Sequence, residues 1–370
     1  MKAFSITWYE KLRKLDYIVL AAVLGLTLVS LITLAGAAND IGTKYFYVQL
    51  GAAVLGFVAM AVISTIDYEE VADKFSVVLF AIGVLLLGIT LVIGTGDGNK
   101  SWIRFSWLPI GIQPSEFVKV LYIVSFSKHI SLVRDKINHP FSLLKLGAHA
   151  GIIIGLIMLQ GDLGSALVFM FMTAAMLYCA GLSFWYFLAA AGAIVAAAPF
   201  LWSRLAEYQQ RRIIAGFRPE IDPTDKGFQA LMSRNAIAAG GFFGTGFSGG
   251  TEYQKVPYVH TDFIFAITSE KFGFFGALLV IVMLCVLVIR ALVLAQKMRG
   301  SYASSMCVGV AAVLVAQYIG MCLARLPVVG ITLPFMSYGG SSMVASYCLI
   351  GIVQSINAHR GKYFFERQKK

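Results

Sequence analysis

Charged side chains are scarce in this sequence of 370 residues. Asp, Glu, Lys and Arg together make up 13% of it, whereas about 25% is typical of a soluble domain. Hydrophobic residues account for 58%. This shortage of charge excludes an ordinary soluble enzyme and predicts an all-α polytopic membrane protein.

The sequence also lacks the cysteine patterns of zinc and disulfide sites. None of its cysteines forms a CxxC pair or a cluster with histidine. All of them lie within apolar runs, which indicates that they pack inside the membrane. They are Cys179, Cys285, Cys307, Cys322 and Cys348.

A nucleotide-binding loop is absent as well. Ala239–Gly250 is rich in glycine, but it has no GxxxxGK[ST] motif and no strand precedes it, so it predicts a tightly turning or flexible loop. The net charge of +11 would suit nucleic acid. Because the basic residues lie at the ends of apolar runs, as the positive-inside rule expects, we predict no nucleic-acid partner.

Apolar runs of roughly 17 residues or more, long enough to cross a bilayer, recur along the chain. They predict about ten transmembrane helices in a single membrane domain that covers residues 1–370. A polar segment over residues 203–260 predicts one large extracytoplasmic loop between the seventh and eighth helices. The helices are expected near Asp16–Ala37, Tyr45–Ile66, Phe75–Ile93, Pro114–His129, Leu144–Leu159, Leu163–Ala180, Phe184–Trp202, Asp262–Ala295, Ala303–Leu323 and Phe335–Ile356.

Lysine and arginine in the short loops indicate the orientation of these helices. Their distribution places both termini in the cytoplasm, with the net acidic loop Asp67–Lys74 as the exception. The first run ends in Ala35-Gly36-Ala37, which resembles a signal-peptidase site. Since the run is about 20 residues long, we expect an uncleaved helix. This orientation puts the polar motifs on the outer side of the membrane.

His260 and Asp262 lie where the polar loop enters the eighth predicted helix. We expect Thr261 to cap that helix and to place Asp262 in its first turn, where the helix dipole favours the carboxylate and the nearby bilayer disfavours it. A pKa suited to a general base near neutral pH is then possible. A capping role alone would explain the aspartate equally well.

Glu116 and Lys119 stand three residues apart in the fourth predicted helix, so their side chains share one face. A helix that carries both charges must line a cavity or a helix interface. A purely structural ion pair is the alternative. Asp162, in the short link QGDLGS, is expected to cap the sixth helix.

The outer loop is rich in arginine, whose guanidinium group suits phosphate and pyrophosphate. The arginines are Arg211, Arg212, Arg218 and Arg234, and solvated loop charge is the simpler reading for any one of them. Pro327–Ser342 enters the tenth helix through Pro, Gly and Ser, and irregular backbone at this depth predicts a cavity rim. Together these groups suit an anionic, amphiphilic substrate.

These motifs resemble those of the SEDS family of bacterial cell-wall proteins, the RodA and FtsW group. The matching pieces occur in family order across almost the whole chain. They are SWI at Ser101–Ile103, QPSEFVK at Gln113–Lys119, DLGS at Asp162–Ser165, YQxxR at Tyr208–Arg212, HTDFIFA at His260–Ala266 and LPFMSYGGSS at Leu333–Ser342.

The resemblance implies a peptidoglycan glycosyltransferase in the bacterial cytoplasmic membrane. Lipid II, a disaccharide-pentapeptide on undecaprenyl pyrophosphate, would be polymerised on the outer face, with Asp262 matching the family's essential aspartate. The implied substrate-binding residues are Glu116, Lys119, Asp162, Arg212, His260, Ser337, Gly339 and Gly340. No cofactor is fixed by the resemblance, although Mg²⁺ or Mn²⁺ would suit the pyrophosphate. The implied partner is a class B penicillin-binding protein, whose membrane helix would pack against the eighth and ninth helices.

This sequence departs from the family pattern at three places. Tyr258 stands where the family has Glu, Glu270-Lys271 replaces two acids, and Gly161 replaces proline. These departures leave Asp262 intact but give the neighbouring positions no assigned role. PVVG at Pro327–Gly330 and the short tails favour RodA over FtsW, and a sporulation paralogue stays open. A flippase for lipid-linked precursors and a non-catalytic scaffold for a transpeptidase are the competing functions.

Overall fold

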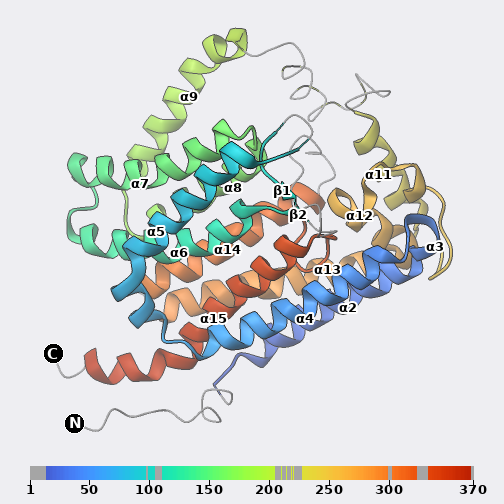
Figure 1. Ribbon diagram of the computed structural model, residues 1–370, viewed down its shortest axis with the longest axis horizontal. Helices are drawn as coiled ribbons and strands as arrows, with labels where there is room; N and C mark the ends of the chain where they lie inside the picture. Colours follow the sequence, from blue (N-terminus) through green and yellow to red (C-terminus); the bar gives the residue numbers. More distant parts are fainter. Residues whose placement is uncertain are drawn as a thin grey trace.

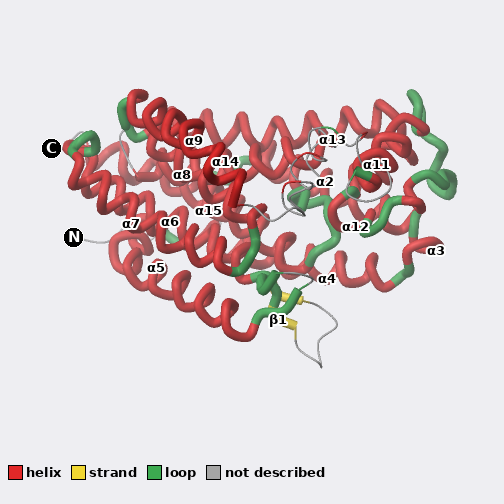
Figure 2. Tube along the Cα trace, turned by 90° about the horizontal axis from the view of Figure 1, so that it is seen from above, coloured by secondary structure: helices red, strands yellow, loops and turns green. Residues whose placement is uncertain are grey.

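A computed structural model describes residues 14–96, 99–104, 111–204, 210, 214, 218, 220, 227–298, 302–322 and 332–367. These residues form a bundle of long helices that run roughly side by side (Figures 1 and 2). The strands β1 (Ile103–Arg104) and β2 (Gly111–Ile112) form a small antiparallel hairpin beside it. The all-α membrane fold predicted from composition is confirmed.

Each predicted transmembrane segment corresponds to a helix. They are α2 (Tyr17–Gly36), α4 (Lys44–Thr65), α5 (Tyr68–Ile93), α6 (Pro114–Val133), α7 (Pro140–Leu159), α8 (Leu163–Cys179), α9 (Phe184–Arg204), α13 (Ile264–Lys297), α14 (Tyr302–Cys322) and α15 (Gly340–Arg367). The shorter elements are α3 (Ala38–Ile41), η1 (Arg134–Lys136), α11 (Phe228–Ala239), η3 (Tyr253–Lys255) and α12 (Val259–Asp262).

Three helices begin four or more residues from the predicted place, and one of them is α7, which begins at Pro140 instead of Leu144. Helix α5 starts seven residues early, at Tyr68 instead of Phe75, because the Asp67 carboxylate accepts a hydrogen bond from the Glu69 amide and caps the helix there. Helix α15 starts at Gly340 instead of Phe335, since the residues before it form turns that contact other elements. The hydropathy of a segment locates its span but does not set its ends.

Seven helices in the described part of the chain are long and apolar enough to cross a membrane. Helices α8 and α9 provide two shorter apolar segments. Helix α6 is more polar because it carries Glu116 and Lys119. The chain is therefore a multi-pass membrane protein, and the total of about ten spans stays a prediction.

Helix α15 lies at the centre of the bundle, with 94% of its most apolar stretch buried, whereas only 17% of that of α5 is buried. Close approach of α15 to α4 depends on Gly56, where a Cβ atom would come within 2.5 Å of the Tyr347 ring. The Tyr347 hydroxyl reaches across to Thr27 of α2 at 2.8 Å. Small residues and hydroxyl bonds of this kind hold membrane helices together.

The start of α2 and the C-terminal part of α15 lie at the same end of the bundle (Figure 1). The Gln354 side chain bonds the Asp16 amide at 2.8 Å and the Asp16 carbonyl at 3.0 Å. Asn357 donates to the Lys14 carbonyl at 2.7 Å. Helices α3, α11 and α12 lie at the opposite end (Figure 1).

Helix α13 is not one continuous helix, because Gly273 interrupts it with φ 66° and ψ −163°. Main-chain groups of the glycine-rich segment Gly240–Gly250 form hydrogen bonds with the residues around the break. The Glu270 and Lys271 carbonyls accept from the amides of Thr245 and Gly246, at 2.9 and 3.0 Å. The amides of Phe274 and Phe275 donate to the carbonyls of Gly241 and Phe242. The predicted turning loop is confirmed, and it is built into the helix break.

We expect Gly273→Ala to destabilise the fold by roughly 1–3 kcal/mol or more, because the backbone conformation of residue 273 is accessible almost only to glycine. A Cβ at this position would also meet the Gly244 nitrogen at 2.3 Å. Thermal unfolding in detergent measures the effect. Gly155→Ala is the matched control, since its Cβ would meet nothing within 4 Å in α7. Equal melting temperatures for the two variants would contradict this assignment.

Candidate active site

Asp262 is the last residue of α12, a single turn that begins after Tyr258. The Tyr258 carbonyl accepts hydrogen bonds from the amides of Thr261 and Asp262, at 3.1 and 3.2 Å, and from the Thr261 hydroxyl at 2.9 Å. Phe263 then leaves the helical conformation with φ −133°. The prediction that Thr261 caps the long helix is therefore wrong, because the non-helical residue Phe263 separates Asp262 from α13.

Burial brings the pKa of Asp262 close to neutral pH. Its side chain is half-buried, and burial raises the pKa of Asp262 to about 6, with the Thr261 side chain opposing that shift in part. A carboxyl group with a pKa near the working pH can both accept a proton and release it again. This is the behaviour that a general base needs.

His260 packs against two aromatic rings, which also contact each other, at this mouth of the bundle. Its ring centroid is 4.1 Å from that of Tyr45 and 5.5 Å from that of Tyr338. Burial and the nearby charge of Lys44 lower the pKa of His260, so the imidazole is neutral at pH 7. Its main-chain carbonyl accepts from the Tyr338 amide at 2.9 Å. The histidine therefore connects α12 to the segment that precedes α15.

That segment, residues 332–339, is held in place from two sides. The Ser337 hydroxyl donates to the Thr261 carbonyl at 2.6 Å and accepts from the Leu333 amide at 2.9 Å. On the other side, Gln49 of α4 donates to the Ser337 carbonyl at 3.0 Å and accepts from the Gly339 amide at 3.4 Å. Ser337 and Gly339 therefore shape the backbone here, and Gly340 begins α15.

Gln49 supports this segment, although no sequence motif pointed to it. Its side chain is fully buried and also bonds Ser30 at 3.1 Å. A glutamine in the middle of an apolar run was the available signal, because polar groups inside a membrane are costly and usually have a defined partner.

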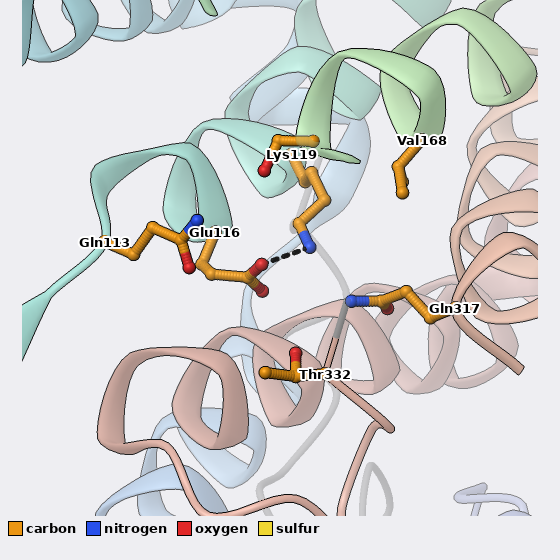
Figure 3. Close-up of a pocket in the computed structure, with 7 residues that line it drawn as sticks. Gln113, Glu116, Lys119, Val168, Gln317 and Thr332 are labelled. Carbon is orange, nitrogen blue, oxygen red and sulfur yellow. Dashed lines mark hydrogen bonds and ion pairs between the residues drawn. The ribbon is translucent and has the colours of Figure 1, made fainter. Parts of the chain in front are cut away.

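Glu116 and Lys119 form a buried ion pair of 2.7 Å on one face of α6, as their spacing predicted (Figure 3). Gln113, Ser165, Val168, Gln317 and Thr332 line the small space beside them. This space of about 10 Å³ holds roughly one water molecule. The Gln317 Oε1 and Thr332 Oγ1 atoms are buried without a hydrogen-bond partner among the described residues, so a water or a substrate group would satisfy them.

Asp162 caps α8, as predicted, and also connects it to α6. Its carboxylate accepts from the Ser165 amide at 2.9 Å, from the Ser165 hydroxyl at 2.8 Å and from the Gln113 amide group at 2.9 Å. The Gln113 main-chain amide in turn donates to Ser341 of α15 at 3.2 Å. Residues 332–341 therefore contact both the α6 pair and α12, which brings the two halves of the predicted site to one segment.

Glu270 and Lys271, which had no assigned role, hold the loop that leads to α12. Both are 1% exposed. The Glu270 carboxylate accepts from the amides of Thr251, Glu252 and Tyr253 at 2.8, 2.9 and 2.6 Å. The Lys271 ammonium donates to three main-chain carbonyls, of Gly36, Phe247 and Gly249, at 2.9–3.0 Å. Two charges inside an apolar run were again the signal in the sequence.

The predicted phosphate-binding arginines are only partly described. Arg211 and Arg212 lie outside the described residues. Arg218 is exposed, and Arg234 pairs with Glu220 at 2.9 Å. In the described part of the chain, no group of three or more His, Cys, Asp or Glu side chains is placed to hold a metal ion.

The chain is similar to known proteins over nearly its whole length. The sequence profile of the FtsW, RodA and SpoVE family, described as cell cycle proteins, matches residues 13–362. A probable peptidoglycan glycosyltransferase FtsW from Trichlorobacter lovleyi is 31% identical over 368 residues, 94% of this chain and 94% of its own. The peptidoglycan glycosyltransferase MrdB of Escherichia coli K12 is 33% identical over 368 residues, 96% of each chain.

Solved structures with this fold include a chain from a study of a peptidoglycan synthase complex that coordinates polymerization and crosslinking. It has a TM-score of 0.81 and 26% identity, and the match covers 94% of this chain and 98% of that one. The rod shape determining protein RodA of Thermus thermophilus has the same fold, with a TM-score of 0.69 at 23% identity and coverage of 94% and 97%.

We expect Lys119→Met to destabilise the protein by about 3–5 kcal/mol, because it leaves the buried Glu116 carboxylate without its partner. The double variant Glu116→Gln/Lys119→Met should recover much of this loss, since no unpaired charge remains. Thermal unfolding in detergent measures both. The control is Lys74→Met, which breaks an exposed pair with Glu70 and should cost less than about 1 kcal/mol. A double variant no more stable than Lys119→Met would contradict a structural pairing.

Proposed function

The chain belongs to the FtsW, RodA and SpoVE family of cell cycle proteins, and we propose that it is a peptidoglycan glycosyltransferase with Asp262 as its general base. The observation that best supports this proposal is the half-buried Asp262 carboxylate, whose pKa is raised to about 6. The substrate is lipid II, the lipid-linked disaccharide-pentapeptide from which glycan strands are made.

The proposed reaction forms one glycosidic bond for each lipid pyrophosphate released. Asp262 accepts the proton of the acceptor sugar's 4-hydroxyl as that oxygen attacks the anomeric carbon of the donor. The bond from this carbon to the pyrophosphate breaks with inversion, and the electron pair leaves with the phosphate oxygen. One carboxylate is sufficient, since pyrophosphate is a good leaving group.

Basic side chains would stabilise the charge of the departing pyrophosphate. Lys119 donates one proton to Glu116 and keeps two further protons for phosphate oxygens. Arg212 is the proposed second cation. A divalent ion would enter mainly through the pyrophosphate oxygens, because Mg²⁺ in proteins is usually bound by one or two carboxylates together with substrate phosphates.

Sidedness and partner are further parts of the proposal. Both termini would lie in the cytoplasm of a bacterium, with α12 facing the outer side of its inner membrane. The opposite positions of the α2 start and α12 along the bundle support this orientation (Figure 1). The partner would be a class B penicillin-binding protein whose membrane helix packs on α13 and α14. Exposed apolar side chains of α13, including Leu279 and Val282, support that contact.

Asp262→Asn and Asp262→Ala should each lower the rate of glycan polymerisation by about 10²–10⁴-fold, the usual contribution of a general base. The assay supplies lipid II to the purified protein with its matched transpeptidase and separates the glycan strands by gel. Asp135→Asn, which changes an exposed carboxylate in η1, is the control. Undiminished polymer from both Asp262 variants would refute the general base.

The polymerisation rate should depend on pH through Asp262. The active form is the carboxylate, so with a pKa of about 6 the rate should rise about tenfold per unit at pH values below 6 and level off above about 7. Initial rates from pH 5 to 8 at limiting lipid II measure this profile. A rate that stays flat between pH 5 and 7 would show that another group controls the proton transfer.

A further inference from the structure

A groove separate from the Glu116–Lys119 pair opens beside α12. Its volume is about 320 Å³, at the lower end of the range of roughly 300–1,000 Å³ that is usual for small-molecule sites. Helix α3 contributes Asp40 and Ile41 to its lining. The other lining residues are Gln254, Val256, Tyr258, Val259 and His260.

Tyr258 occupies this groove in an unusual backbone conformation. Its φ of 54° and ψ of 32° are left-handed, which is a true outlier for a bulky side chain. The residue is nevertheless 65% exposed, so packing of the side chain does not explain the strain. Backbone strain of this kind concentrates at ligand sites, and here it keeps a tyrosine ring on the wall of an open groove.

The polar groups of the groove are suited to a neutral ligand with hydroxyl and amide groups. Asp40 is positioned by a hydrogen bond from the Tyr253 hydroxyl, and a carboxylate accepts bonds from ligand hydroxyls. The Gln254 amide can both donate and accept. The residues that line the groove include neither lysine nor arginine, so a pyrophosphate would meet a carboxylate there with no cation among them.

We propose that this groove binds an N-acetylhexosamine of the glycan acceptor, with the sugar face on the Tyr258 ring and its polar groups on Asp40 and Gln254. The inference rests on the proposed function, since it assigns the acceptor side of that reaction. Val259 lines the groove and Asp262 follows it three residues later. Residues so spaced on a helix have Cβ atoms about 5–6 Å apart, so a sugar in the groove lies next to the base.

The test measures binding of N,N′-diacetylchitobiose to the full-length protein in detergent micelles by saturation-transfer NMR. All variants carry Asp262→Asn as well, so that binding is measured without turnover and independently of the general-base proposal. Tyr258→Gly removes the ring but keeps a residue that adopts the left-handed backbone easily. Tyr258→Phe keeps the ring. Tyr178→Ala removes a tyrosine of similar exposure from α8, outside the groove.

Tyr258→Gly and Asp40→Asn should each weaken binding at least tenfold, while Tyr258→Phe and Tyr178→Ala should stay within threefold of the parent. Saturation transfer to the N-acetyl protons of the disaccharide should be strong in the parent and should be lost in Tyr258→Gly, which has no ring. Equal binding by the parent and Tyr258→Gly, or no binding by the parent at millimolar disaccharide, would overturn the acceptor groove. Either result would leave the polymerisation assay of Asp262 as an independent test of the proposed function.

Discussion

Backbone groups that leave the helical pattern inside a membrane must find other hydrogen-bond partners, because no water is there to serve them. Two places near the candidate site have such replacement hydrogen bonds. At Gly273, the segment Gly240–Gly250 supplies the amides and carbonyls that the broken helix lost. Before α15, the Gln49 side chain bonds the irregular residues 336–339. The second arrangement fixes a segment that bonds the main-chain carbonyls of His260 and Thr261, next to Asp262.

Buried charges in the bundle are stabilised in two different ways. Glu116 and Lys119 neutralise each other across one helical turn. Glu270 and Lys271 are adjacent in the chain and are instead held separately, by three amides and by three carbonyls. The hydrogen bonds of these two charged side chains therefore stabilise the loop before α12. The first arrangement leaves a charged pair beside a small polar space that holds roughly one water molecule.

Asp262 differs from all four because it is only half-buried and close to the mouth of the bundle. Complete burial without a charged or hydrogen-bonded partner would keep a carboxyl group protonated at neutral pH, and full exposure would return its pKa to the ordinary acidic value, where it is a weak base. The intermediate position, at the end of a single turn tied to residues 332–339, gives a pKa of about 6. Position therefore sets the base strength.

Hydropathy alone located the spans, and charges within apolar runs pointed to Asp262, Glu116 and Lys119, because the cost of such charges is a local property of the sequence. The Asp162 cap was equally local. The break at Gly273, the separation of Asp262 from α13 and the roles of Gln49 and Lys271 were decided only in three dimensions. Their hydrogen-bond partners lie tens to hundreds of residues away, so no sequence window contains them.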